Sequence, residues 1–167
     1  ESVEGGETWA RYSFLGPEPR LVLTAKNGRI TLRHGDGRTE RLPDGNPLEV
    51  LRDLLRRFQP VAVPGLPRFQ GGAVGFLAYD MVRHMERLPD ATRDDLGLPD
   101  AVFLFTDTLL VFDNLRHRLL VIANAMIEER TPAALDQAYD RAALRIGMTL
   151  AKLARPARTT TPLTLAP

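Results

Sequence analysis

The sequence predicts an α+β fold in which antiparallel β-sheets pack as a sandwich with flanking helices. Short runs of alternating polar and apolar residues are joined by tight turns, which is typical of antiparallel strands. Two longer segments instead carry apolar residues at helical spacing. Strands and helices do not alternate regularly along the chain, which argues against a parallel sheet. At 167 residues, the chain is large enough for a hydrophobic core of its own.

A meander of three strands is predicted near the start, at 21–25, 29–33 and 38–42. The first turn is Asn27-Gly28 and the second is Gly35-Asp36-Gly37, and both contain residues that accept the positive φ angles of tight hairpins. Within 29–33, apolar and polar side chains alternate. We therefore expect one buried and one solvated face.

The first predicted helix follows the meander. Asn46 is the expected N-cap, Pro47 fits the first helical position, and Glu49 is placed to complete a capping box. Pro60 and the Pro-Gly-Leu-Pro segment at 64–67 should end the helix and form a loop. The apolar residues at helical spacing are Leu48, Leu51, Leu54, Leu55 and Phe58.

A second sheet region and a last helix complete the predicted fold. A short helical segment is expected at 79–86, and 113–117 should connect the last two strands as a hairpin. The last helix starts with Thr131 as its cap and Pro132 inside it. The strands of this region are predicted at 71–77, 101–106, 109–112 and 119–123, and the apolar stripe of the last helix comprises Leu135, Tyr139, Ala142, Ile146, Leu150 and Leu153.

Composition excludes several classes of function. The 22 basic and 21 acidic residues nearly cancel and are scattered, so we expect no nucleic-acid binding. With no cysteine, the chain has no disulfide framework, thiolate metal site or cysteine nucleophile. No apolar run approaches the roughly 20 residues that cross a bilayer, and the start does not resemble a signal peptide. We expect a soluble, cytoplasmic protein that does not bind membranes.

Three groups of residues suggest chemistry, and each has a plainer explanation. The glycine-rich stretch 71–75 does not have the spacing of a nucleotide-binding loop, so it is predicted to be a tight strand entry or bulge. The histidines are too far apart in sequence to predict a metal site. The aspartates are predicted to be turn, strand-edge and cap residues, because none has a partner that would separate their pKa values. These residues are His34, His84 and His117, and Asp94, Asp95, Asp100, Asp107 and Asp113.

The first sixteen residues contain the elements of a small polar pocket. A carboxylate from Glu1 or Glu4 would pair with an ammonium group, while Ser2 and glycine amides would receive a carboxylate. Polar segments with glycines are more often plain loops, so this pattern by itself favours the loop. Trp9 and Tyr12 would line a cavity or, more commonly for aromatics beside a strand, belong to the core.

Three blocks together resemble the amino-terminal region of anthranilate synthase component I, in the order and at the separations of that family. They are 1–16 (ESVEGGETWARYSFLG), 70–89 (QGGAVGFLAYDMVRHMERLP) and 94–114 (DDLGLPDAVFLFTDTLLVFDN). The resemblance implies part of an enzyme that converts chorismate to anthranilate and pyruvate, with magnesium and with ammonia from a glutaminase subunit. It also implies that the catalytic residues and the magnesium ligands belong to a carboxyl-terminal chorismate-binding domain outside this chain.

The resemblance further implies a feedback site for L-tryptophan. Glu1 and Ser2 match the last two positions of the family's Leu-Glu-Ser motif, so they are the two predicted inhibitor-binding residues. We expect no catalytic or metal-binding residue in this chain. Two alternatives stay open: the corresponding region of aminodeoxychorismate synthase component I, and a free-standing α+β binding module.

The division of the chain is predicted from the same resemblance and from composition. We interpret 1–154 as the regulatory domain and the Arg/Thr/Pro-rich stretch 155–167 as a linker toward the catalytic domain, because that stretch has almost no apolar content. A frayed natural terminus has the same composition and is the alternative explanation.

Overall fold

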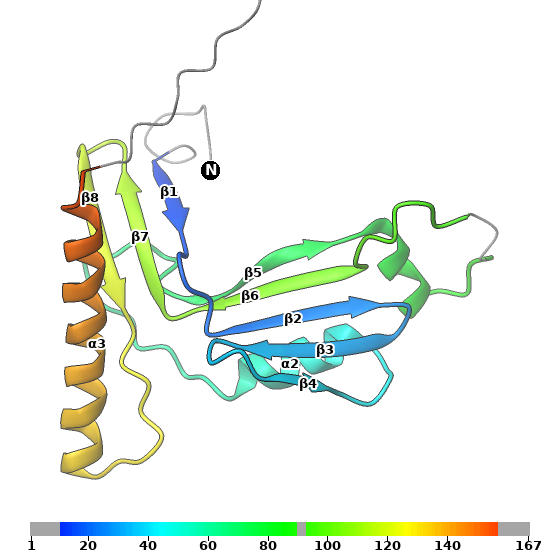
Figure 1. Ribbon diagram of the computed structural model, residues 1–167, viewed down its shortest axis with the longest axis horizontal. Helices are drawn as coiled ribbons and strands as arrows, with labels where there is room; N and C mark the ends of the chain where they lie inside the picture. Colours follow the sequence, from blue (N-terminus) through cyan, green and yellow to red (C-terminus); the bar gives the residue numbers. More distant parts are fainter. Residues whose placement is uncertain (1–10, 90–92, 157–167) are drawn as a thin grey trace, which may run out of the picture. The chain divides into compact units, whose positions relative to one another are not determined.

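The computed structural model describes residues 11–89 and 93–156 (Figure 1). The chain divides into two compact units, Glu1–Asn124 and Ala125–Pro167. The described elements are β1 (Tyr12–Leu15), β2 (Leu21–Lys26), β3 (Arg29–His34), β4 (Thr39–Arg41), α2 (Pro47–Arg56), β5 (Gly72–Leu77), the 3-10 helix η1 (Tyr79–His84), β6 (Ala101–Thr106), β7 (Thr108–Asp113), β8 (Arg118–Ala123) and α3 (Pro132–Leu153).

The first unit contains two antiparallel sheets. One has five strands in the order β4-β3-β2-β6-β5, and the other has three in the order β1-β7-β8. Two connections link them, because β1 leads into β2 and β6 leads into β7 (Figure 1). The predicted α+β class with antiparallel sheets and helices is confirmed.

The predicted meander is present as β2, β3 and β4. Asn27 and Gly28 have φ angles of 49° and 75°, and Lys26 pairs with Arg29 across the turn. Two successive positive φ angles are what a two-residue hairpin turn requires, and this geometry follows the right-handed twist of the strands. The local sequence therefore sets the register of the whole β2–β3 pair.

Helix α2 begins where the capping residues predicted it. The side-chain oxygen of Asn46 accepts a hydrogen bond from the Leu48 N–H at 3.0 Å, and Pro47 occupies the first turn. The helix ends at Arg56, so Phe58 lies beyond it, with its ring 4.8 Å from the guanidinium carbon of Arg20. The predicted apolar stripe is therefore one residue too long at its end.

Two core clusters hold the first unit together. The larger lies on one face of the five-stranded sheet, against α2 and η1, and contains Leu21, Leu23, Ala25, Ile30, Leu32, Leu54, Met81, Ala101 and Phe105. The smaller belongs to the three-stranded sheet and contains Leu109, Val111 and Ile122, with Tyr12, Leu66, Phe69 and Leu120 packed against it. Tyr12 is thus a core-packing residue, as its place beside a strand predicted.

Helix α3 belongs to the second unit. Thr131 caps it through a hydrogen bond from the Ala134 N–H to its hydroxyl oxygen at 3.3 Å, as predicted. Its buried residues are Ala138 and Ala142, whereas four members of the predicted stripe are between 41% and 71% exposed. The helix is present as predicted, and these four side chains are exposed among the described residues. They are Leu135, Tyr139, Leu150 and Leu153. Among the described helices, none has the length and apolar character to cross a membrane.

Candidate functional site

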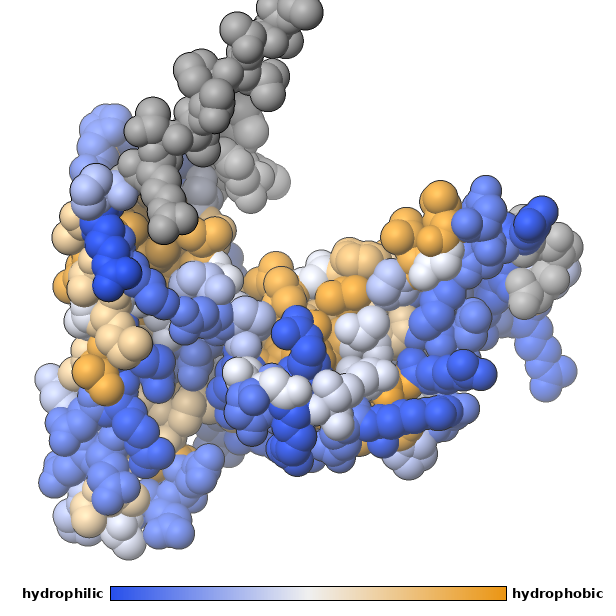
Figure 2. All heavy atoms as spheres, in the orientation of Figure 1, coloured by the Kyte–Doolittle hydropathy of each residue, from blue (hydrophilic) through white to orange (hydrophobic). Residues whose placement is uncertain are grey.

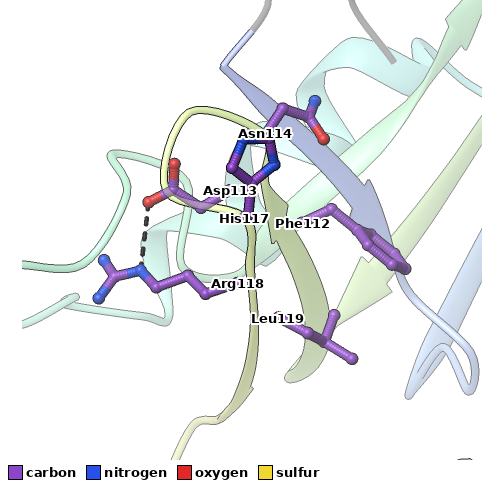
Figure 3. Close-up of a pocket in the computed structure, with 6 residues that line it drawn as sticks. All are labelled: Phe112, Asp113, Asn114, His117, Arg118 and Leu119. Carbon is purple, nitrogen blue, oxygen red and sulfur yellow. Dashed lines mark hydrogen bonds and ion pairs between the residues drawn. The ribbon is translucent and has the colours of Figure 1, made fainter.

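The main polar centre of the first unit is the carboxylate of Asp113, the last residue of β7. Its side chain is fully buried. Arg11 binds it through two hydrogen bonds, from Nε to Oδ1 at 3.0 Å and from Nη2 to Oδ2 at 3.1 Å. Arg118 donates from Nε to Oδ2 at 3.2 Å (Figure 3), and the Arg116 N–H donates to Oδ1 at 3.3 Å. The carboxylate therefore has four hydrogen-bond donors.

Strand pairing explains why these groups meet. Asp113 pairs with Tyr12 of β1 on one side and with Arg118 of β8 on the other. Arg11 immediately precedes β1, so its guanidinium lies next to the end of β7, and its carbonyl accepts a hydrogen bond from the Asn114 N–H at 2.8 Å. One buried charge thus joins all three strands of this sheet. A bidentate arginine is the geometry expected for a strong pair with a carboxylate.

The charge state of Asp113 follows from its donors. Hydrogen bonding from Arg11 is the main cause that lowers the pKa of Asp113 from 3.8 to about 2, with the Arg116 N–H and Arg118 acting in the same direction and burial opposing them. The group stays ionised near neutral pH. A general acid or base needs a pKa closer to the working pH, so Asp113 has the properties of an anchor.

A hollow of about 400 Å³ lies at the tip of the β7–β8 hairpin. This volume falls within the range of small-ligand sites. Figure 3 shows the side chains of Asp113 and Arg118 on one side of the hairpin, and those of Phe112 and Leu119 on the other. The polar and apolar groups therefore do not converge on one enclosed space. The lining residues are Phe112, Asp113, Asn114, His117, Arg118 and Leu119.

The predicted inhibitor-binding residues, Glu1 and Ser2, lie outside the described residues, as do Glu4 and Trp9. Their roles stay predictions. The described chain begins at Arg11, whose side chain is bound to Asp113.

Some aspartates have the predicted turn and strand-edge positions, whereas the ion pairs of Asp113 were not predicted. Asp94 accepts a hydrogen bond from the Gly97 N–H at 2.9 Å, as a turn residue does, whereas Asp100 lies just before β6 and accepts one at 2.6 Å from the Asn27 N–H in the distant β2–β3 turn. Lys26 forms ion pairs with both carboxylates. Asp113 lies at a strand end as predicted, but its buried ion pairs with Arg11 and Arg118 were not predicted. The available signal was a lone acid at the end of an apolar strand, with Arg116 and Arg118 following it.

The histidines and glycines carry no site in the described residues. His34, His84 and His117 lie on β3, on η1 and in the β7–β8 turn, and the described residues contain no group of three His, Asp or Glu side chains that would hold a metal ion. Gly71 and Gly72 have φ angles of 150° and 129° at the entry to β5. The stretch is therefore a strand entry, as predicted.

Comparison with known proteins identifies the family. A profile described as chorismate binding enzyme matches residues 3–165. Anthranilate synthase component 1 of Acetivibrio thermocellus is 43% identical over 141 residues, covering 84% of this chain, and that of Pseudomonas aeruginosa is 38% identical over 158 residues, covering 93%. The crystal structure of anthranilate synthase component I from Streptococcus pneumoniae superposes with a TM-score of 0.65 at 27% identity, covering 94% of this chain.

The extent of the match matters as much as its strength. The chain spans only 28% and 31% of the length of those two relatives, and 32% of the solved structure. The resemblance seen in the three sequence blocks is confirmed. The chain belongs to the family of chorismate-binding enzymes, and its relatives are anthranilate synthase component I proteins.

Proposed function

We propose that this chain is the regulatory, amino-terminal part of an anthranilate synthase component I, and that it does not catalyse the reaction by itself. The observation that carries this proposal is the match to anthranilate synthase component 1 over 84% of the chain but 28% of the relative. In the proposal, residues 1–154 form the regulatory part, and residues 155–167 lead toward the chorismate-binding catalytic part. The complete enzyme would convert chorismate to anthranilate and pyruvate in the cytoplasm.

The regulatory ligand in this proposal is L-tryptophan, held by Glu1 and Ser2. A carboxylate pairs with the ammonium of a zwitterionic amino acid, a hydroxyl donates to its carboxylate, and an apolar gap accepts the indole. The Arg11–Asp113 pair anchors the start of β1, which follows this segment in the sequence.

Inhibition requires a coupling between two sites. Tryptophan must bind one arrangement of the regulatory and catalytic parts better than the other. The factor by which bound tryptophan lowers the affinity for chorismate then equals the factor by which bound chorismate lowers the affinity for tryptophan. Part of the inhibitor pocket is proposed to come from the catalytic part. The chain alone should therefore bind tryptophan more weakly than a complete subunit does.

Magnesium and the glutaminase subunit belong to the complete enzyme in this proposal. The described residues do not fit a magnesium site, because no three carboxylate or imidazole groups among them are arranged to hold a cation. Ammonia would come from the glutaminase subunit, the second component of the complex. Neither the metal nor that subunit is assigned to residues of this chain.

Calorimetry with L-tryptophan tests the regulatory site. The proteins are this chain, full-length component 1 from Acetivibrio thermocellus, and a chimera in which this chain replaces the 141-residue matched stretch of that relative. We expect the chain to bind more weakly than the chimera and the full-length relative. In the chimera, Glu1→Gln and Ser2→Ala should each lower the affinity about tenfold, the loss expected for a charge-assisted hydrogen bond, whereas Glu4→Gln should not.

Two results would contradict the proposal. Equal tryptophan affinity of the chain and the full-length relative would show that the catalytic part contributes nothing to the pocket. Formation of anthranilate by the chain alone, with chorismate, ammonia and magnesium supplied, would show that the catalytic residues are present. If the full-length protein that contains this chain makes aminodeoxychorismate instead of anthranilate, the alternative member of the superfamily is the correct assignment.

A further inference from the structure

The two edges of the five-stranded sheet differ in a way that indicates a missing neighbour. Among the described residues, β4 and β5 are the outermost strands. An exposed edge strand tends to pair with other chains, and proteins protect such edges with short strands and charged side chains. Strand β4 has both protections, because it is three residues long (TER) and Glu40 and Arg41 are charged and exposed.

Strand β5 has neither protection. It is six residues long, and its sequence GAVGFL contains no charged residue and no proline. Val74 and Phe76 are each 50% exposed. In a sheet whose other edge is guarded, an unguarded apolar edge is expected to be covered in the complete protein.

The exposed side chains of β5 continue an apolar band on the next strand. Val74 pairs with Leu104, and Phe76 pairs with Val102. Because successive side chains of a strand point to opposite faces, these four residues lie on the face opposite to the one packed against α2. Figure 2 shows hydrophobic residues gathered over β5 and β6 and hydrophilic ones over β3 and β4.

We propose that an extended segment from the remainder of a full-length component I pairs with the free edge of β5 and covers Val74 and Phe76. The inference rests on the proposed function, because it requires this chain to work inside a longer polypeptide. The relatives support the choice of occupant, since this chain matches only 28% to 32% of their length. The greater part of each relative is therefore available in the same polypeptide.

Hydrogen–deuterium exchange tests this pairing with an internal control. In an edge strand, the amides that point away from the sheet exchange readily, and a new neighbouring strand protects them. We expect the outward amides of residues 72–77 to exchange about tenfold more slowly, or slower still, in the chimera than in the chain alone. Exchange in β4 should be equally fast in both. The aligned strand of the unmodified relative should be protected as well, which keeps the test decisive if the chimera does not fold.

Variants on the exposed face provide the second measurement. Val74→Lys and Phe76→Lys in the chimera should restore fast exchange in β5, because a charge on this face is costly to cover. Val74→Thr keeps the side-chain shape and should have a smaller effect in the same direction. Leu55→Lys is the matched control, because Leu55 is 39% exposed on α2, away from the edge. Circular dichroism of the isolated chain should show that all four variants fold.

Three outcomes separate the explanations. Equal exchange of β5 in the chain and the chimera would overturn the inference. Dimerisation of the chain, with β5 protected only in the dimer, would assign the edge to a second copy and would overturn it as well. Protection of β5 in a chimera that does not bind tryptophan would refute the regulatory site and leave the β5 pairing standing.

Discussion

The carboxylate of Asp113 joins the β7–β8 hairpin to β1, a strand that is far away in sequence. Arg11 lies 102 residues before it, and Arg118 lies five residues after it. Removing one member of a buried ion pair leaves the other charge without its partner, which destabilises a fold more than the pair itself contributes. Asp113 therefore stabilises the three-stranded sheet only while its carboxylate is charged.

Replacing Asp113 with asparagine should lower the melting temperature at pH 7 and change its pH dependence. A carboxyl whose pKa is about 2 in the folded chain contributes stability that is complete above its ordinary pKa of 3.8 and is lost as the pH falls through about 2. The difference between the wild-type chain and Asp113→Asn should therefore shrink as the pH falls from about 4 to about 2. Thermal unfolding followed by circular dichroism measures it.

Asp44→Asn serves as the control for that series. Asp44 pairs with Arg41 at 3.1 Å, but both side chains are at least 60% exposed, and surface pairs contribute little. Its melting curve should follow that of the wild-type chain at every pH. A constant difference between the wild-type chain and Asp113→Asn over the same range would show that Asp113 is not held ionised by its partners.

Helix α2 shows how a short element depends on its first residue. It has ten residues, and isolated helices of this length are marginal in water. Its stability comes from burial of Leu54 and from the cap that Asn46 provides. Because α2 covers the core face of the five-stranded sheet, a weaker cap also weakens that core.

Substitution of Asn46 by alanine should reduce the free energy of unfolding by about 1 kcal/mol, because the Leu48 N–H loses its acceptor. Urea unfolding measures the change. Asn46→Ser keeps an accepting oxygen at the cap and should recover most of the stability. If alanine and serine are equally destabilising, the side-chain hydrogen bond is not the cause.

The first unit of the molecule contains both core clusters. Every residue of the two clusters lies between Tyr12 and Ile122, within the unit Glu1–Asn124. The chain from 124 to 131 forms neither helix nor strand. The physical basis for cooperative folding is therefore present before α3 begins.

A chain that ends at Asn124 should still unfold in one cooperative transition and keep its β-sheet circular dichroism. It should lose the helical signal of the 22 residues of α3. A chain that ends at Thr106 is the control, because it removes β7 and β8 and with them the smaller core cluster. Loss of the cooperative transition on truncation at Asn124 would show that the second unit is needed for the first to fold.

The elements of this protein were predictable where a local interaction determines them. Asn27-Gly28 allows a turn that few other pairs allow, and Asn46 and Thr131 cap their helices through their own side chains. These signals require no knowledge of distant residues. Family membership was equally accessible, because three sequence blocks with the correct separations carry it.

The Asp113 centre and the uncovered edge of β5 depend on contacts between strands, which local sequence does not encode. The burial of Asp113 arises when Arg11 and Arg118 meet it across three paired strands, and the exposure of Val74 and Phe76 follows from the strand order that places β5 at an edge. By itself, the sequence determined the turns, the caps, the family and every described strand except β1, which was not predicted. Only the tertiary structure decided which charge is buried and which apolar strand is left uncovered, because both depend on pairing between residues remote in the chain.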